Sequence, residues 1–74
     1  MSTITKEQFI QWSFERDWNL GLLDNIKTVN ELLPEEKEAY EEEADYYLSG
    51  GYKEMGWPED IVDRAKRENV ELPS

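Results

Sequence analysis

The chain has 74 residues and a formal net charge of −10, from 18 Asp and Glu against eight Lys and Arg. It contains no cysteine and no histidine, which excludes disulfides, thiolate-bound zinc, thiol nucleophiles and the commonest general base. A chain of this length makes one small domain, which buries only about 60% of the surface that its unfolded form exposes.

With no disulfide to stabilise the fold, aromatic side chains have to build the core. Each large ring can bury about 150–250 Å² of surface. Disordered acidic chains are poor in aromatic residues, so we expect this chain to fold. The candidate core residues are Phe9, Trp12, Phe14, Trp18, Tyr40, Tyr46, Tyr47, Tyr52 and Trp57.

The first predicted helix runs from about residue 6 to residue 17. Thr5 is followed by Gln8 at the spacing of a capping box, in which each side chain bonds the backbone N–H of the other residue. Trp18 stands at the end of the helix. The broad apolar face before it consists of Phe9, Ile10, Trp12 and Phe14.

Between residues 22 and 31 the pattern predicts a short irregular helix. Gly21 interrupts the chain before it, and Asp24 and Thr28 are candidate N-caps. Apolar residues recur at i, i+4, i+7 and i+11, which is typical of one helix face. They are Leu22, Ile26, Val29 and Leu33.

The second predicted helix, residues 34–48, has the clearest boundaries. Pro34 suits the first helical position, and Leu33 before it is expected to pack back on the helix. Ser49 should end the helix, with the glycines at 50 and 51 supplying a left-handed cap. The apolar seam consists of Leu33, Tyr40, Ala44, Tyr47 and Leu48.

Residues 52–57 are predicted to form a loop, and Pro58 opens a third helix over residues 58–69. Ile61, Val62 and Ala65 should face inward. Residues 70–74 are expected to form an extended tail, which Pro73 keeps non-helical. The expected fold is therefore all-α, with a bundle of three main helices in a single domain over residues 1–74.

The negative charge is concentrated in the second helix. Residues 35–45 hold seven acids and one base, giving −6, whereas residues 1–34 (five acids, three bases) and 46–74 (six acids, four bases) each carry −2. Anions are unfavourable in the C-terminal half of a helix. Glu38 with Glu42, and Glu41 with Asp45, are also like-charge i, i+4 pairs, each of which destabilises a helix by a few tenths of a kcal/mol.

A projection at 100° per residue places these acids, with Glu35, opposite the apolar seam. Tyr46 lies on the outer side, bordered by carboxylates, where it could anchor an interface. A glutamate-rich face is more commonly just the solvated side of a helix, so both interpretations stay open. The predicted partner-binding residues are Glu38, Glu41, Glu42, Asp45 and Tyr46.

No catalytic, cofactor or metal motif is present in the sequence. Ser13 and Ser49 have no evident base beside them, and paired carboxylates need a pocket that separates their pKa values before they act as acid and base. The glutamates lack the Asp, Asn and Gly pattern of a calcium loop. The glycines at 50 and 51 follow a helix, whereas phosphate sites use helix N-termini. We expect no enzyme, no cofactor and no metal.

Charge and hydropathy also restrict the partners. The N-terminus shows no secretory signal, and the apolar runs are no longer than two or three residues, so we expect a cytoplasmic protein that does not enter membranes. The net charge disfavours direct binding of nucleic acid or anionic membranes. It permits a basic protein partner, attracted electrostatically.

Residues 32–52, LLPEEKEAYEEEADYYLSGGY, resemble the start of the last helix of an HMG box. The chain lacks the basic face of that family, so no DNA-binding residue is carried over. EMGWPEDIVDRAK, residues 54–66, faintly resembles the Met-Gly-Phe loop and following helix of ubiquitin-associated domains, whose third helix is missing here. We instead expect Trp57 to fix the loop to the bundle. In size, charge and lack of catalytic residues, the chain is similar to small acidic proteins that bacteriophages encode against host machinery, some of which mimic DNA.

Our leading hypothesis is a non-enzymatic interaction protein, encoded by a phage or mobile element. Its acidic helix would dock on a basic, nucleic-acid-binding surface of a host protein in the host cytoplasm, as an inhibitor or DNA mimic. One alternative is a structural protein that forms a homodimer through surplus rings around Trp12, Phe14, Trp18 and Trp57. Another is a regulatory module whose charge serves only solubility.

Overall fold

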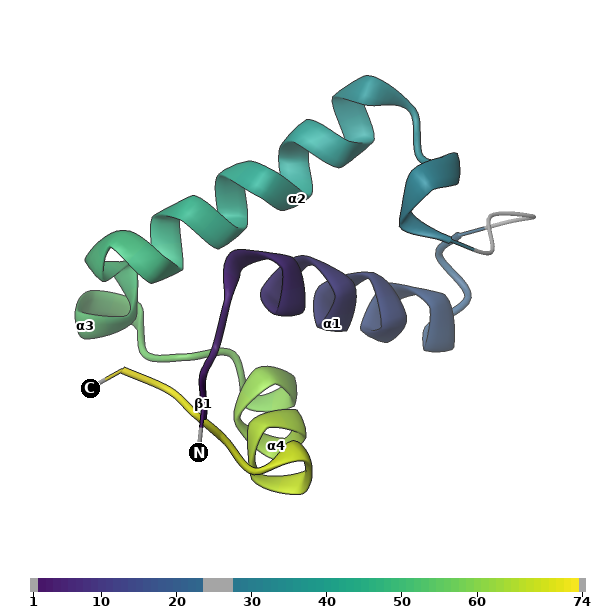
Figure 1. Cartoon of the computed structure of the whole chain (residues 1–74). Coiled ribbons are helices and arrows are strands. Elements are labelled where there is room, and N and C mark those ends of the chain that lie inside the picture. Colours follow the sequence, from purple (N-terminus) through teal and green to yellow (C-terminus); the bar gives the residue numbers. More distant parts are fainter. Residues whose placement is uncertain (1, 24–27, 74) are drawn as a thin grey trace.

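The computed structural model describes residues 2–23 and 28–73, and most of the regular structure there is helical (Figure 1). The main helices are α1 (Lys6–Asn19), α2 (Pro34–Tyr46) and α4 (Glu59–Glu68), with a short α3 (Tyr52–Met55). A 3-10 turn, η1 (Val29–Glu31), precedes α2, and a π-helical turn, η2 (Tyr47–Gly51), follows it. Strands β1 (Ser2–Thr3) and β2 (Val70–Glu71) lie near the two chain ends. The predicted all-α class with three main helices is confirmed.

Helix α1 begins where the capping box predicts. The Gln8 backbone N–H donates to Thr5 Oγ1 at 3.1 Å, and the Thr5 N–H donates to Gln8 Oε1 at 2.9 Å. The helix continues past residue 17 to Asn19, because the left-handed residue that turns the chain is Gly21, with φ of 76°. Two of the last carbonyls, at Arg16 and Asp17, accept from the Leu20 and Leu22 N–H groups.

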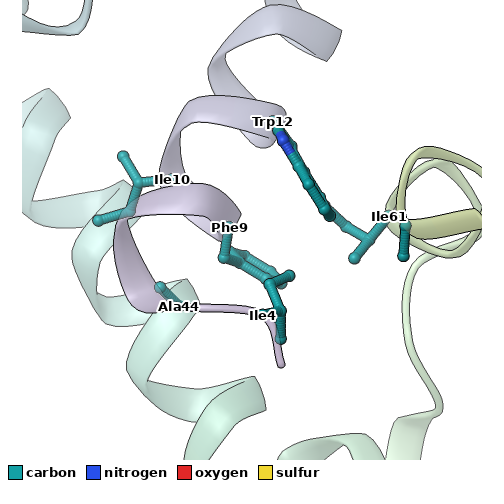
Figure 2. Close-up of a cluster of buried hydrophobic side chains, with 7 residues drawn as sticks. Ile4, Phe9, Ile10, Trp12, Ala44 and Ile61 are labelled. Carbon is teal, nitrogen blue, oxygen red and sulfur yellow. The ribbon is translucent and has the colours of Figure 1, made fainter. Parts of the chain in front are cut away.

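The core forms where α1 lies between α2 and α4 (Figure 1). Phe9 and Ile61 are fully buried, and Trp12 packs beside Ile61 (Figure 2). Ile10 lies on the other side of α1 from Trp12, next to α2 (Figure 2). The core cluster consists of Ile4, Phe9, Ile10, Trp12, Ala44, Ile61 and Ala65.

Trp57 fixes the segment between α3 and α4 to the bundle, as expected. Its ring stacks on Tyr52 at 5.0 Å between centroids and on Tyr47 at 6.0 Å. The indole Nε1–H donates to the Pro73 carbonyl at 2.8 Å, which also ties down the C-terminal segment. One side chain therefore joins the turn after α2, α3 and the C-terminal segment.

A glycine turns the chain near the predicted end of the second helix, but the loop predicted after it is wrong. Gly50 does take a positive φ, 131°, but α2 gives way to the π-helical turn at Tyr47, and helix resumes at Tyr52 where a loop was predicted. Gly51 has an ordinary helical φ of −59°, so its backbone conformation does not require glycine. Glycine is required there because a side chain would have no room. A Cβ on Gly51 would lie only 2.5 Å from the ring of Tyr46.

The seam of α2 also differs from the prediction at its start. Leu33 is 58% exposed, whereas Leu32 is only 7% exposed and enters the interior. Leu33 is the N-cap and has an extended backbone, so it does not continue the helical register of the seam. Ala44 is buried, and Tyr40, Tyr47 and Leu48 pack partly buried against the core, as predicted.

Helix α4 keeps close to its predicted range of 58–69. Pro58 is the N-cap rather than the first helical residue, and Asn69 ends the helix in the left-handed conformation with φ of 60°. Ile61 and Ala65 are buried and Val62 is half-buried.

The last described residues are extended, as predicted, but they do not form a free tail. Strand β2 pairs in parallel with β1, with Ser2 opposite Val70 and Thr3 opposite Glu71. The Ile4 N–H donates to the Glu71 carbonyl at 2.9 Å. This pairing between the chain ends is absent from the prediction, because strands of two residues leave no hydrophobic period to detect.

Within residues 22–31, the described part holds only the 3-10 turn η1. Thr28 precedes this turn, but its hydroxyl donates to the Glu31 side chain at 3.3 Å and makes no side-chain cap. The other candidate cap, Asp24, and the apolar Ile26 lie outside the described residues. Among the helices that the structure describes, none is long and apolar enough to span a membrane.

Candidate protein-interaction surface

All five predicted partner-binding residues lie on α2. Glu38, Glu42, Asp45 and Tyr46 are exposed, and Glu41 is half-buried. Helical spacing brings Glu38 beside Glu42, and Glu41 beside Asp45. We call the four acids the acidic face of α2.

One base from another helix reaches the acidic face. Lys6 Nζ, in the first turn of α1, lies 3.0 Å from Asp45 Oδ1. This hydrogen-bonded pair raises the pKa of Lys6 above its ordinary value, and the negative charges of Asp45 and Glu41 add to the effect. No local pattern in the sequence predicts this contact, because the two residues are 39 positions apart. Lys6 neutralises one end of the acidic face.

The other end of the face carries uncompensated charge. Within residues 2–23 and 28–73, neither Glu38 nor Glu42 forms an ion pair. Both are exposed on α2, where water reaches their carboxylates. Among the described residues, these two acids therefore keep their negative charge unpaired on the surface of α2.

Tyr46 borders the acidic face at the end of α2. Its side chain is 45% exposed, but the ring is held in place by an edge-on contact with Tyr47, with centroids 5.3 Å apart, and by its approach to Gly51. An aromatic ring that is already ordered loses little conformational entropy on binding. This geometry suits the anchor role that the sequence suggests.

Two arginines form ion pairs that connect α1 with α4. Arg64 Nη1 lies 3.0 Å from Glu15 Oε2, and the guanidinium sits over the Trp12 ring at 5.5 Å. Arg16 pairs with Asp17 on its own helix at 3.0 Å and reaches Asp60 of α4 at 3.6 Å. These bases join α1 to α4, so they do not neutralise Glu38 and Glu42.

Ser13 and Ser49, the two serines considered in the sequence, have different surroundings. Ser13 is 1% exposed, and its Oγ has no hydrogen-bond partner among the described residues. Ser49 Oγ donates to the Tyr46 carbonyl at 3.2 Å. In the described ranges, no three carboxylates converge in a way that could hold a metal ion.

No protein-family model matches the chain, and neither a curated protein nor a solved structure matches it. Its function therefore has to be inferred from its own residues.

Proposed function

We propose that this chain is a non-enzymatic interaction protein that docks the acidic face of α2 on a basic surface of another protein. In this proposal the partner is a nucleic-acid-binding protein of a host cell, encountered in the host cytoplasm, and the chain is encoded by a phage or mobile element. The observation that carries the proposal is the pair of exposed carboxylates, Glu38 and Glu42, beside the ordered ring of Tyr46.

The spacing of charge along α2 supports mimicry of a nucleic acid. Residues 35–45 span about 16 Å at the helical rise of about 1.5 Å per residue. Their net charge of −6 gives roughly one negative charge every 3 Å along the axis. A single strand of B-DNA carries one charge per roughly 3.4 Å. Glu36 and Glu43 lie on the side of α2 near Arg16 and Asp17, and Lys6 pairs with Asp45, so a groove that binds phosphates would meet only part of this charge on the acidic face.

The destabilising effect of these negative charges on α2 also supports a role in binding. The carboxylates within each of the pairs Glu38–Glu42 and Glu41–Asp45 repel each other, and Asp45 also lies in the last turn of α2, where the helix dipole disfavours anions. Lys6 compensates only the Asp45 end. A basic partner would supply the missing cations, so docking would relieve repulsion that folding leaves in place.

A pull-down from bacterial lysate with matched charge variants tests the proposal. The α2 variant carries Glu38→Lys and Glu42→Lys, which reverses the charge of the two exposed carboxylates, and circular dichroism checks that its helicity matches that of wild type. The control variant carries Glu54→Lys and Asp63→Lys, two exposed acids on α3 and α4. Both variants change the net charge equally.

We expect wild type and the control variant to retain the same basic protein, and moderate salt to release it because exposed charges are screened. The α2 variant should lose it. Equal retention by all three baits, or equal loss by both variants, would contradict a role for the acidic face.

A second candidate function is self-association through the end of α1. Trp12 and Phe14 are buried, so the proposed surplus of rings is smaller than the sequence suggested. Trp18 is nevertheless exposed, as are Leu20 and Leu22 just beyond it. Sedimentation at several concentrations would reveal a dimer that Trp18→Gln weakens, and a concentration-independent monomer would remove this candidate.

A further inference from the structure

An open hollow lies beside the acidic face, between α1, η1 and α2. Its apolar part is formed by Ile10 of α1 and Val29 of η1. Ile10 lies on the side of α1 that faces α2, away from Trp12 and Ile61 (Figure 2). The charged rim consists of Lys6, Glu7, Lys37 and Glu41.

The hollow and the acidic face share residues. Glu41 belongs to both, and Lys6 lines the hollow while its ammonium group holds Asp45 at 3.0 Å. The rim itself carries two bases and two acids, so it favours neither an anion nor a cation. Its apolar floor suits an uncharged side chain, whereas the neighbouring Glu38 and Glu42 attract cations.

We propose that the hollow receives an apolar side chain of the partner, and that a lysine or arginine next to it on the partner replaces Lys6 at Asp45. This inference rests on the proposed function and specifies the partner's surface as a basic amphipathic helix. In the free protein, Lys6 then occupies the position at Asp45 that the partner's cation takes in the complex. An exposed ion pair contributes little to stability, so it exchanges readily. An arginine could bind the carboxylate through two hydrogen bonds, where Lys6 offers a point charge.

The charges around the hollow favour one of its candidate occupants over the others. A second copy of the chain would bring another net charge of −10 against the acidic face. The rim gives an anionic ligand no net attraction, because Glu7 and Glu41 offset Lys6 and Lys37. A basic amphipathic segment satisfies both the apolar floor and the adjoining carboxylates.

Two synthetic helical peptides test the hollow. Both carry lysines and arginines on one face, and the other face holds leucines in the first peptide and alanines in its twin. We expect wild type to bind the leucine peptide about tenfold more tightly, because a buried leucine contributes more than a buried alanine. Val29→Thr, which makes the floor polar, should abolish most of this preference, whereas the matched control Val62→Thr on α4 should retain it.

A second matched pair of variants tests the role of Lys6. Lys6→Gln should raise affinity for either peptide by about two- to fivefold, since it frees Asp45. Lys66→Gln removes the same charge from an exposed position on α4, on the other side of α1 (Figure 1), and should have a smaller effect. Equal gains from the two variants would overturn the exchange at Asp45. Circular dichroism and thermal melts confirm that each variant folds.

The outcomes separate the two proposals. If both peptides bind equally, and Glu38→Lys with Glu42→Lys abolishes binding, the docking proposal stands and the hollow is overturned. If neither peptide binds wild type more tightly than the Glu38→Lys, Glu42→Lys variant, both proposals are overturned.

Discussion

The hydroxyl of Tyr40 on α2 donates to the Asp17 carboxylate on α1, and this bond is the start of a chain across the molecule. Arg16 holds the other oxygen of Asp17 at 3.0 Å and reaches Asp60 on α4 at 3.6 Å. The three main helices are therefore linked by one polar network alongside the apolar core. Because it lies on the inner side of α2, the network holds the acidic face in place without neutralising Glu38 and Glu42.

Removal of the Tyr40 hydroxyl should weaken this link. Tyr40→Phe keeps the ring, which lies 6.5 Å from Phe14, and deletes only the bond to the carboxylate. We expect a loss of about 1 kcal/mol in the free energy of unfolding, since hydrogen bonds to charged groups contribute more than neutral ones and this one is only partly buried. Urea unfolding measures the loss. Tyr46→Phe is the control, because its hydroxyl lies on the exposed side, and an equal loss there would contradict the network.

The same bond should make stability fall in alkaline solution. Partial burial of Tyr40, followed by its hydrogen bond to Asp17 and the charge of Asp17, raises the pKa of the phenol well above its ordinary value of about 10. The folded state thus binds the phenolic proton more tightly than the unfolded state does. Its contribution is fully present below about pH 10 and is lost as the pH rises further, through the raised pKa.

The measurement is urea unfolding of wild type and Tyr40→Phe from about pH 8 to pH 11. The advantage of wild type should be constant up to about pH 10 and shrink above it. An advantage that grows with pH would contradict the assignment.

Ser13 is the position where a substitution should stabilise the fold. Its hydroxyl is buried and has no hydrogen-bond partner among the described residues. An unsatisfied buried polar group costs about 1–3 kcal/mol. Ser13→Ala should therefore leave stability unchanged or raise it by up to about 1 kcal/mol after the loss of packing. Ser49→Ala, at an exposed hydroxyl, should change it little. A clear loss of stability in Ser13→Ala would show that the hydroxyl has a partner.

Gly51 should show opposite effects with and without the Tyr46 ring. A Cβ at this position would lie 2.5 Å from that ring, so Gly51→Ala should displace Tyr46 and destabilise the protein by about 1 kcal/mol. In a Tyr46→Ala background the clash is gone. Because φ is −59°, alanine should then stabilise by about 0.4–1 kcal/mol through the unfolded state. A double-mutant cycle measures the coupling, and additive effects would contradict the contact.

Local signals in the sequence were sufficient to locate the main helices. The capping box at Thr5, Pro34 as the first residue of α2 and Pro58 just before α4 act through neighbouring backbone, so they fix helix starts without tertiary information. The ends were less predictable. Gly50 has the positive φ expected of a cap, yet helix resumes at Tyr52, whose ring stacks on Trp57. That contact depends on tertiary packing, which no local pattern contains.

The residues of the candidate site could also be predicted in part from local signals in the sequence. A helical projection suffices to place Glu38, Glu42, Asp45 and Tyr46 on the exposed side of α2. It says nothing of Lys6, whose approach to Asp45 depends on how α1 packs against α2. The hollow beside it needs residues of α1, η1 and α2 together. Contacts between distant segments set these features, and the sequence alone does not reveal them.

The central claim is that the acidic face of α2, rather than net charge, binds a basic partner. Its most direct test is the salt dependence of affinity for the leucine peptide, measured for wild type, the α2 variant and the control variant. We expect the affinity of wild type to fall steeply with salt, the control variant to follow closely, and the α2 variant to bind weakly with a shallow dependence. Equal losses of affinity in the two variants would contradict the claim, because net charge alone would then explain the binding.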